Sequence, residues 1–128
     1  MKKILFVCVE NSCRSQMAEA FGHIHKSADL AVYSAGSNPS GQVNPRAVEV
    51  MAERDYPLNQ HRSEGLDSVS GLEFDAVVTM GCGDRCSDVV AHRRLDWPLP
   101  DPKHLPLEQF RQVRDEIETR VIDLIASL

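Results

Sequence analysis

The sequence predicts an α/β fold, a single domain with a four-stranded parallel sheet and helices on both faces. Short apolar runs alternate along the chain with segments whose apolar residues recur at spacings of three and four, the rhythm of an amphipathic helix. Alternating strands and helices indicate a parallel sheet with right-handed crossovers. The 128 residues suffice for one hydrophobic core and are too few for two ordinary domains. We therefore expect one domain over residues 1–128.

The first strand is predicted over residues 4–9, an unbroken apolar run that suits a parallel strand covered on both faces. The first helix is predicted from Arg14, with Ser12 or Ser15 as a candidate N-cap. An apolar stripe with spacings of four and three follows: Met17, Phe21 and Ile24. Such a stripe predicts a helix that packs one face on the sheet.

The rest of the chain alternates in the same way. Strands are predicted at 31–35, 75–80 and 94–97, helices at 45–54 and 106–128, and one short turn at 66–69 in an otherwise irregular stretch. Pro45 suits the first turn of a helix, and Pro98 and Pro100 end the last strand. Ligands bind at the carboxyl ends of the strands in such sheets, so the site is expected there.

The loop between the first strand and the first helix carries the most informative pattern, CVENSCRS at residues 8–15. Backbone N–H groups of such a loop and of the first helical turn point into one space and favour a bound tetrahedral anion. Arg14 adds a planar fork that can hold two oxygens of the anion. The expected oxyanion-binding residues are Val9, Glu10, Asn11, Ser12, Cys13 and Arg14.

Cys8 lies at the base of this loop and is the expected nucleophile. A helix N-terminus and a nearby arginine favour the thiolate form of a cysteine, which is its reactive form. Ser15 could donate a hydrogen bond to the sulfur, and Asn11 could hold the loop through bonds to the backbone. A buried strand cysteine before a surface arginine is the plain alternative, but the joint occurrence of these residues favours a catalytic site.

Composition excludes several classes of protein. With 42% apolar and 26% charged residues the chain is typical of a globular protein. No apolar stretch reaches the length of a membrane span and no signal peptide is evident, so we expect a cytoplasmic protein. A net charge of −5 without a basic block argues against nucleic-acid binding. Because the net charge repels anions, oxyanion affinity must come from local donors.

The remaining cysteines need an explanation, because structural disulfide bonds are unusual in a reducing compartment. Cys82 and Cys86 follow the third strand, on the same side of the sheet as Cys8, and glycines flank Cys82. They could be redox-active or ordinary loop cysteines. All four cysteines could instead bind zinc in a non-enzymatic module, although Arg14 is unfavourable beside a zinc ion. Cys13 is expected to pack under the loop, with a protective disulfide to Cys8 as the alternative.

The pattern Cys-x5-Arg-Ser at the first strand of a small α/β chain resembles the low-molecular-weight protein tyrosine phosphatase family. One branch hydrolyses phosphotyrosine, and another reduces arsenate. The sequence is similar to the arsenate reductase branch in Gln16 and in YSAG at 33–36, NP at 44–45 and DP at 101–102. Lys103 follows the DP pair in place of a tyrosine, and the chain has only seven aromatic residues for walls around a phosphotyrosine. A phosphatase is the second functional hypothesis.

The resemblance implies a thiol relay. Cys8 attacks arsenate, Cys82 attacks Cys8 with release of arsenite, and Cys86 moves the disulfide to where an external thiol reduces it. The implied reductant is thioredoxin, or a glutathione- or mycothiol-type thiol with glutaredoxin. Phosphate and sulfate are expected to compete with arsenate.

The resemblance also implies an acid and an ion. Asp101 matches the general acid that protonates the departing oxygen. Four residues match positions that surround a monovalent cation in some related reductases, where oxygen ligands suit potassium: Asn11, Glu19, Ser34 and Asp67.

Overall fold

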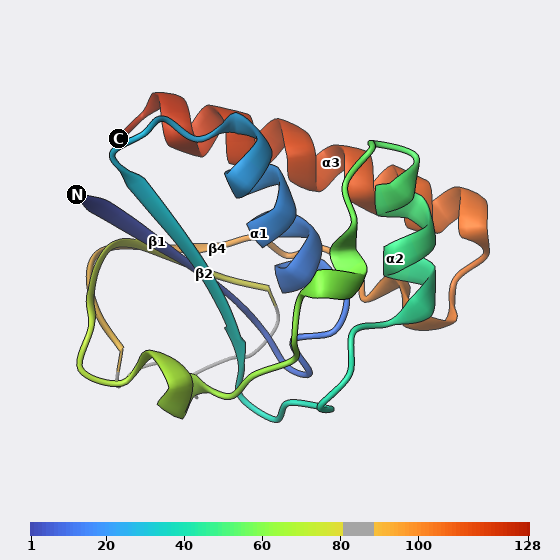
Figure 1. Ribbon diagram of the computed structural model, residues 1–128, viewed down its shortest axis with the longest axis horizontal. Helices are drawn as coiled ribbons and strands as arrows, with labels where there is room; N and C mark the ends of the chain where they lie inside the picture. Colours follow the sequence, from blue (N-terminus) through green and yellow to red (C-terminus); the bar gives the residue numbers. More distant parts are fainter. Residues whose placement is uncertain (81–88) are drawn as a thin grey trace.

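A computed structural model describes residues 1–80 and 89–128 of the chain. Within these residues the strands form one parallel sheet in the order β2-β1-β3-β4. The strands are β1 (Lys2–Cys8), β2 (Leu30–Gly36), β3 (Glu73–Thr79) and β4 (Val90–Asp96). Figure 1 shows both chain termini near the amino ends of the strands, so the carboxyl ends lie on the far side of the molecule.

The two faces of the sheet are covered unequally. Packed on one face are α1 (Arg14–His25), α2 (Pro45–Ala52) and α3 (Leu107–Ala126), with α1 beside α3 (Figure 1). The other face is covered by η2 (Leu66–Val69), a single 3-10 turn. The predicted four-stranded parallel sheet is therefore confirmed, but the α-helices of the described chain share one face.

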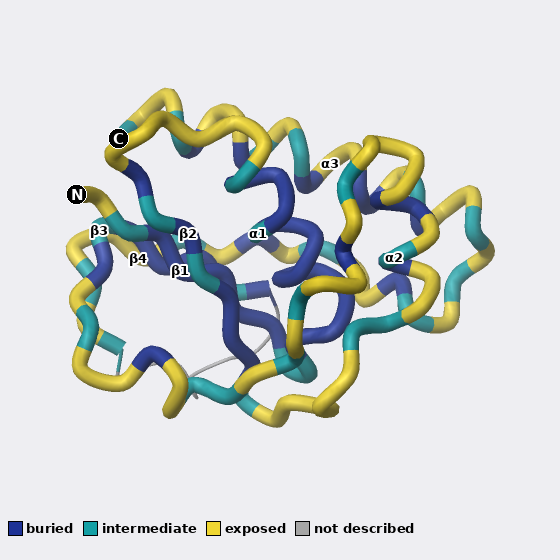
Figure 2. Tube along the Cα trace, in the orientation of Figure 1, coloured by how far each residue is buried: buried dark blue, intermediate teal, exposed yellow. Residues whose placement is uncertain are grey.

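Strand β1 forms the centre of the core. Ile4 and Phe6 point toward the α-helices, while Leu5 and Val7 point to the face that η2 covers. All four side chains are fully buried, and Figure 2 shows burial along most of the strand and along the inner side of α1. The unbroken apolar run thus reflects a strand covered on both sides, as predicted.

Two details of the α1 prediction are wrong. Cys13 is the N-cap, and no side chain caps the helix, so neither predicted serine has this role. Ser15 is instead turned toward Cys8, where its hydroxyl has another partner. Ile24 is 43% exposed rather than part of a buried stripe, because it lies in the last turn of the helix.

Strand β4 begins at Val90, four residues earlier than predicted. It pairs only with β3, at the edge of the sheet, and its residues are mostly exposed. An edge strand needs no continuous apolar run, so its polar sequence concealed it. Elsewhere the observed bounds differ from the predicted ones by one or two residues, and η2 matches its predicted range. Within the described chain no helix is long and apolar enough to cross a membrane.

We expect Gly22→Ala to destabilise the protein. A Cβ at Gly22 would lie 2.7 Å from Cγ1 and 3.0 Å from Cγ2 of Val32, a β-branched side chain that cannot turn both atoms away. The clash should outweigh the helix propensity of alanine and lower the free energy of unfolding by about 1–2 kcal/mol, measured by urea denaturation. Adding Val32→Ala should cost less in the Gly22→Ala background than alone. Unchanged or higher stability of Gly22→Ala would contradict this packing.

Candidate active site

Cys8 ends β1 at the centre of the sheet and is 3% exposed. The six residues that follow it, which we name the oxyanion loop (residues 9–14), turn the chain back into α1. This is the carboxyl end of the sheet, where the sequence predicted the site. The site residues of the loop therefore surround the sulfur as one continuous segment.

The carbonyl oxygens of residues 9–13 in the oxyanion loop all accept hydrogen bonds from other parts of the chain. The donors and distances are Asn38 N to Val9 O (2.7 Å), Ser40 N (3.1 Å) and Ser63 Oγ (2.8 Å) to Glu10 O, Gln16 Nε2 to Asn11 O (3.0 Å), Asn44 N to Ser12 O (3.0 Å) and Met17 N to Cys13 O (2.9 Å). In a planar trans peptide the N–H points opposite to the C=O. The N–H groups of residues 10–14 therefore point the other way, and they have no acceptor among the described residues.

The turn at Asn11 and a close approach at Gly36 shape the loop. Asn11 has a φ of 51°, in the left-handed region that asparagine tolerates better than most residues. Gly36, at the end of β2, packs against the loop so closely that a Cβ there would lie 2.7 Å from Val9 O and 2.9 Å from Asn11 N. A larger residue at Gly36 would displace the loop. Glycine is therefore required because the loop packs so closely against it, and not because of its backbone φ angle.

Arg14 adds a guanidinium that is held in place but not saturated. Its Nη1 donates to Leu99 O at 3.0 Å, and its Nη2 lies 3.8 Å from Asp101 Oδ2. Its Nε is buried and has no partner in the described structure. A buried donor without a partner is costly, and an oxyanion on the loop would satisfy it.

Ser15 donates its hydroxyl hydrogen to the Cys8 sulfur. The two atoms are 2.9 Å apart, and the direction follows from Asn11. Asn11 Oδ1 accepts from Glu64 N at 2.8 Å, so its Nδ2 is the atom that donates to Ser15 Oγ at 2.7 Å. The Ser15 oxygen already accepts from Asn11 and can give its own hydrogen to sulfur. A donor to sulfur stabilises a thiolate.

Gln16 and His61 hold Asn11 from behind. Gln16 Nε2 donates to the carbonyl oxygen of Asn11 and to Arg62 O, at 3.0 and 2.8 Å. Its Oε1 must therefore accept from His61 Nδ1 at 2.9 Å, which leaves His61 Nε2 as the acceptor for the Tyr56 hydroxyl at 2.7 Å. Burial lowers the pKa of His61, although the charge of nearby Glu19 opposes this. A neutral His61 matches the tautomer that these bonds require.

Glu19 lies behind the loop among hydrogen-bond donors. It accepts from the Ser34 hydroxyl at 2.6 Å, and His23 Nε2 is 3.0 Å away. His61 Nδ1 is 3.6 Å from the same carboxylate. Burial raises the pKa of Glu19, but the bonds from His23 and Ser34 outweigh it, so the net shift is downward. Glu19 is therefore a carboxylate at neutral pH.

Only two of the four predicted cation ligands converge. Glu19 and Ser34 are in contact, whereas the side-chain oxygen of Asn11 already accepts from two N–H groups. Asp67 lines a separate hollow. Potassium binding at these residues therefore stays a prediction.

Asp101 lies at the mouth of the site. It is the N-cap of η4 (Pro102–His104), where Oδ1 accepts from Lys103 N at 3.1 Å. Its other oxygen faces Arg14, and 48% of its side chain is exposed. The structure thus brings Asp101 next to the arginine of the oxyanion loop, as a general acid at the mouth requires.

Cys13 differs from Cys8 in its surroundings. Burial raises the pKa of the Cys13 thiol to about 12, against a smaller opposing effect from its contact with Ser12. Nearby Asp101 adds to the rise. Both cysteines are free thiols. Cys13 is therefore neutral at physiological pH, which supports the packing role expected for it.

Cys82 and Cys86 lie outside the described residues. The described chain reaches this segment at Met80, whose N–H donates to Val7 O at 2.8 Å, and resumes at Val89. Met80 is therefore hydrogen-bonded to Val7, the residue that directly precedes the Cys8 nucleophile.

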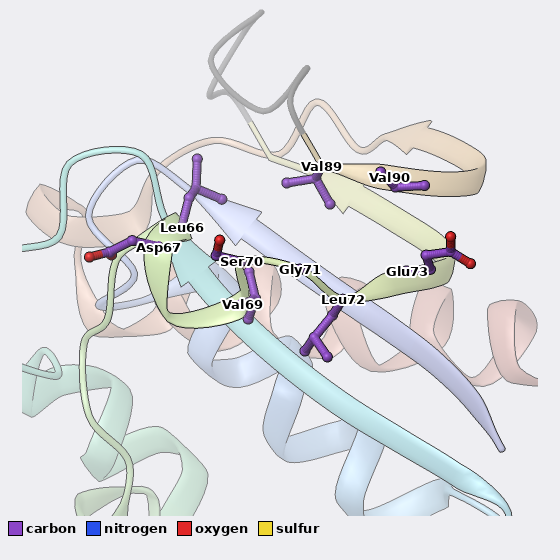
Figure 3. A pocket seen from close by; sticks show the side chains of 9 residues that line it. All are labelled: Leu66, Asp67, Val69, Ser70, Gly71, Leu72, Glu73, Val89 and Val90. Carbon is purple, nitrogen blue, oxygen red and sulfur yellow. The ribbon is translucent and has the colours of Figure 1, made fainter.

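A hollow of about 380 Å³ lies elsewhere, on the face that η2 covers (Figure 3). Its walls come from η2 and from the starts of β3 and β4, including Leu66, Leu72 and Val90. No residue of the oxyanion loop lines it. The hollow is therefore separate from the Cys8 site.

Several contacts of the site were not predicted. Leu99 supplies only a carbonyl oxygen, which no side-chain pattern can reveal. Gln16 was noted as a difference between two branches of a family, but its bonds to residues 61 and 62 were not foreseen. Lys103 contacts Glu10, 93 positions away in the sequence. A lysine directly after the Asp-Pro pair was the one available signal.

Comparison with known proteins gives a consistent picture. The sequence profile described as low molecular weight phosphotyrosine protein phosphatase matches residues 3–128. A glutaredoxin arsenate reductase from Synechocystis sp. is 37% identical over 131 residues, covering 100% of this chain and 99% of the relative. An arsenate reductase from Staphylococcus xylosus is 39% identical over 123 residues, covering 94% and 93%.

A solved structure described as an arsenate reductase in the phosphate binding state has a TM-score of 0.87 and 36% identity to this chain. The match covers 99% of this chain and 98% of that one. Fold and sequence similarity therefore extend over the same full length, including the oxyanion loop.

We expect Cys13 to resist alkylation in the folded protein. With a pKa of about 12, roughly one Cys13 thiol in ten thousand is ionised at pH 8, and the sulfur is also buried. Iodoacetamide at pH 8 should leave the Cys13 peptide unmodified, by mass spectrometry, and urea should make it reactive. Cys13→Ser serves to assign the peptide. Labelling of native Cys13 as fast as in urea would contradict this environment.

Proposed function

Since the chain belongs to the low molecular weight phosphotyrosine protein phosphatase family, we propose that it is an arsenate reductase, with Cys8 as the nucleophile. The observation that carries the proposal is the oxyanion loop next to Cys8, in which the carbonyls of residues 9–13 are bound by other groups and the N–H groups of residues 10–14 have no acceptor among the described residues. The arsenate reductases that match over nearly the whole chain support the choice of substrate.

Substrate binding uses local donors against an unfavourable net charge of −5. Arsenate is a tetrahedral oxyanion that accepts hydrogen bonds through several oxygens at once. Donors from residues 10–14 and the free Nε of Arg14 satisfy these oxygens at short range, where salt screens little. Phosphate and sulfate have the same shape and charge, and we expect both to compete for the loop.

In the first chemical step the Cys8 thiolate attacks the arsenic atom. Ser15 stabilises the thiolate through its hydrogen bond before the attack. A new S–As bond forms, and one oxygen of arsenate leaves as water after Asp101 gives it a proton. Asp101 is suited to this role because its partly exposed carboxyl lies beside Arg14 of the oxyanion loop. The product is a Cys8–arsenic adduct.

The reduction follows from attack on that adduct. The Cys82 thiolate attacks the Cys8 sulfur, the electron pair of the S–As bond passes to arsenic, and arsenite leaves as As(III). Two thiol electrons have then gone into arsenic and one Cys8–Cys82 disulfide has formed. Cys86 attacks Cys82 in turn and frees Cys8. The bond between Met80 and Val7 supports this order, because it brings the chain to Cys8 just before Cys82.

The cycle requires an external thiol. The Cys82–Cys86 disulfide must be reduced by a dithiol such as thioredoxin, or by a glutathione- or mycothiol-type thiol with glutaredoxin. The glutaredoxin arsenate reductase of Synechocystis favours the second route for this chain. Both donors operate in a reducing compartment, so we propose the cytoplasm as the location and no nucleic acid or membrane as partner.

Two other hypotheses are less well supported. A phosphatase would use the same loop and acid, but the described mouth of the site carries the Lys103–Glu10 contact rather than aromatic walls. In a zinc module the cysteines would serve as metal ligands. Among the described residues the one cluster that could hold a metal ion is Glu19, His23 and His61, which contains no cysteine, and Cys8 is engaged with Ser15 instead.

The proposed activity is tested by comparing two reactions of the same protein. We expect arsenate turnover with a thiol reductant, detected as arsenite formation, to be at least about a hundredfold more efficient than hydrolysis of phenyl phosphate. Cys8→Ser should abolish arsenate turnover while the protein stays folded, because the hydroxyl is a poor nucleophile. Faster ester hydrolysis than arsenate reduction would reject the reductase and favour the phosphatase.

The relay predicts different products for two substitutions. Cys82→Ser should stop multiple turnover, since the Cys8–arsenic adduct cannot be resolved within the protein. Cys86→Ser should allow one arsenite per chain and trap a Cys8–Cys82 disulfide, visible by mass spectrometry of non-reduced peptides. Lys26→Ala, at an exposed position at the end of α1, is the control and should keep turnover within about twofold. Full multiple turnover by Cys82→Ser would rule out the relay.

A further inference from the structure

The segment that carries Asp101 contacts both ends of the oxyanion loop. We name residues 99–103 the acid loop. At one end Leu99 O and Asp101 contact the Arg14 guanidinium. At the other end Lys103 Nζ contacts Glu10, the second residue after Cys8. The acid loop therefore runs across the oxyanion loop, from its last residue to nearly its first.

The contact between Lys103 and Glu10 is a two-pronged ion pair. Lys103 Nζ lies 3.0 Å from one Glu10 oxygen and 2.9 Å from the other. The hydrogen bond to Glu10 raises the pKa of Lys103, and Asp101 raises it further, so the lysine stays charged at physiological pH. Because Lys103 N also donates to Asp101, the same residue ties the acid to the ion pair.

The ion pair cannot serve mainly to attract the substrate. The Glu10 carboxylate neutralises the Lys103 charge. Among the described residues of the two loops, Arg14 has a buried Nε without a partner that an oxyanion can use. The function of the ion pair must therefore come from its position, where it joins the acid loop to the oxyanion loop.

The position of the Lys103–Glu10 ion pair matters because of the side on which the leaving group departs. In an in-line displacement the leaving group lies opposite the nucleophile, so with Cys8 at the base it points to the mouth. The leaving group of arsenate is a single oxygen. The leaving group of a phosphate ester is a whole organic group, which needs more room on the side of the site where the acid loop contacts the oxyanion loop.

We propose that Lys103 determines specificity, because its ion pair with Glu10 closes the mouth of the oxyanion loop to organic phosphate esters and leaves room for inorganic oxyanions. The inference rests on the proposed function and deepens it by naming the excluded class of substrate. An ester can bind only when the pair opens. The side chains of Lys103 and Glu10 are 38% and 33% exposed, and such partly exposed pairs favour the closed state by a factor of about five at most.

The test measures ligand binding to two variants, Lys103→Ala and Lys103→Arg. Binding is the concentration of inorganic phosphate, or of phenyl phosphate, that halves the rate of Cys8 alkylation by iodoacetamide. In Lys103→Ala we expect the preference for inorganic phosphate over phenyl phosphate to fall about threefold to fivefold. Lys103→Arg keeps the charge and can pair with Glu10, so it should retain the original preference. Lys26→Ala, an exposed lysine at the end of α1, controls for net charge.

Ionic strength separates an ion pair from a merely structural role. Salt screens an exposed pair, so the preference of the unmodified protein should fall as salt rises, while that of Lys103→Ala should not change. An unchanged preference in Lys103→Ala, or equal salt dependence in both proteins, would overturn the proposal. Alkylation does not require turnover. A protein that fails to reduce arsenate but shows these shifts would refute the reductase assignment and still support the role of Lys103.

Discussion

The site depends on one constraint: the carbonyl oxygens of residues 9–13 are bound by groups outside this segment, so the N–H of each of these peptides points the other way. The donors come from the segments after β2, from Ser63 and from α1 itself. Buried N–H groups need an acceptor, and several that point into one space favour an anion. The surrounding chain thus holds the loop in a shape that is complementary to its ligand before the ligand binds. Such preorganisation is what makes electrostatic catalysis effective.

A second group of side chains, behind the oxyanion loop, positions the hydrogen-bond donor to the Cys8 sulfur. Ser15 can donate to Cys8 only because Asn11 donates to Ser15, and Asn11 is held in its left-handed turn by Glu64 and Gln16. Gln16 is oriented in turn by His61. Each member of this chain of bonds both donates and accepts, and the bonds of its neighbours fix which of its atoms does which. A change at one end therefore affects the thiolate at the other, and these residues act as positioning residues.

The charge distribution explains how an acidic protein can bind an anion. The net charge of −5 gives no long-range attraction, and acidic side chains stand at both ends of the mouth, Glu10 and Asp101. Each has a basic partner, Lys103 for Glu10 and Arg14 for Asp101. Pairing cancels most of the field at the rim, while the buried N–H groups and the free Nε of Arg14 act at contact distance. Binding is therefore selective for a ligand small enough to reach them.

The sequence by itself determined the local parts of this protein: the buried strand before Cys8, the start of α1 at Arg14, the helix that Pro45 opens and the turn at 66–69. These depend on periodicity, apolar runs and proline, which act over a few residues. The polar edge strand β4 was only half found, because one neighbour does not impose an apolar pattern. Tertiary structure alone decided which donors bind the loop carbonyls, that Gln16 meets His61 and that Lys103 meets Glu10. Those partners lie 45 and 93 positions apart, and only the parallel crossovers bring the carboxyl ends of the strands, with their loops, to one edge of the sheet.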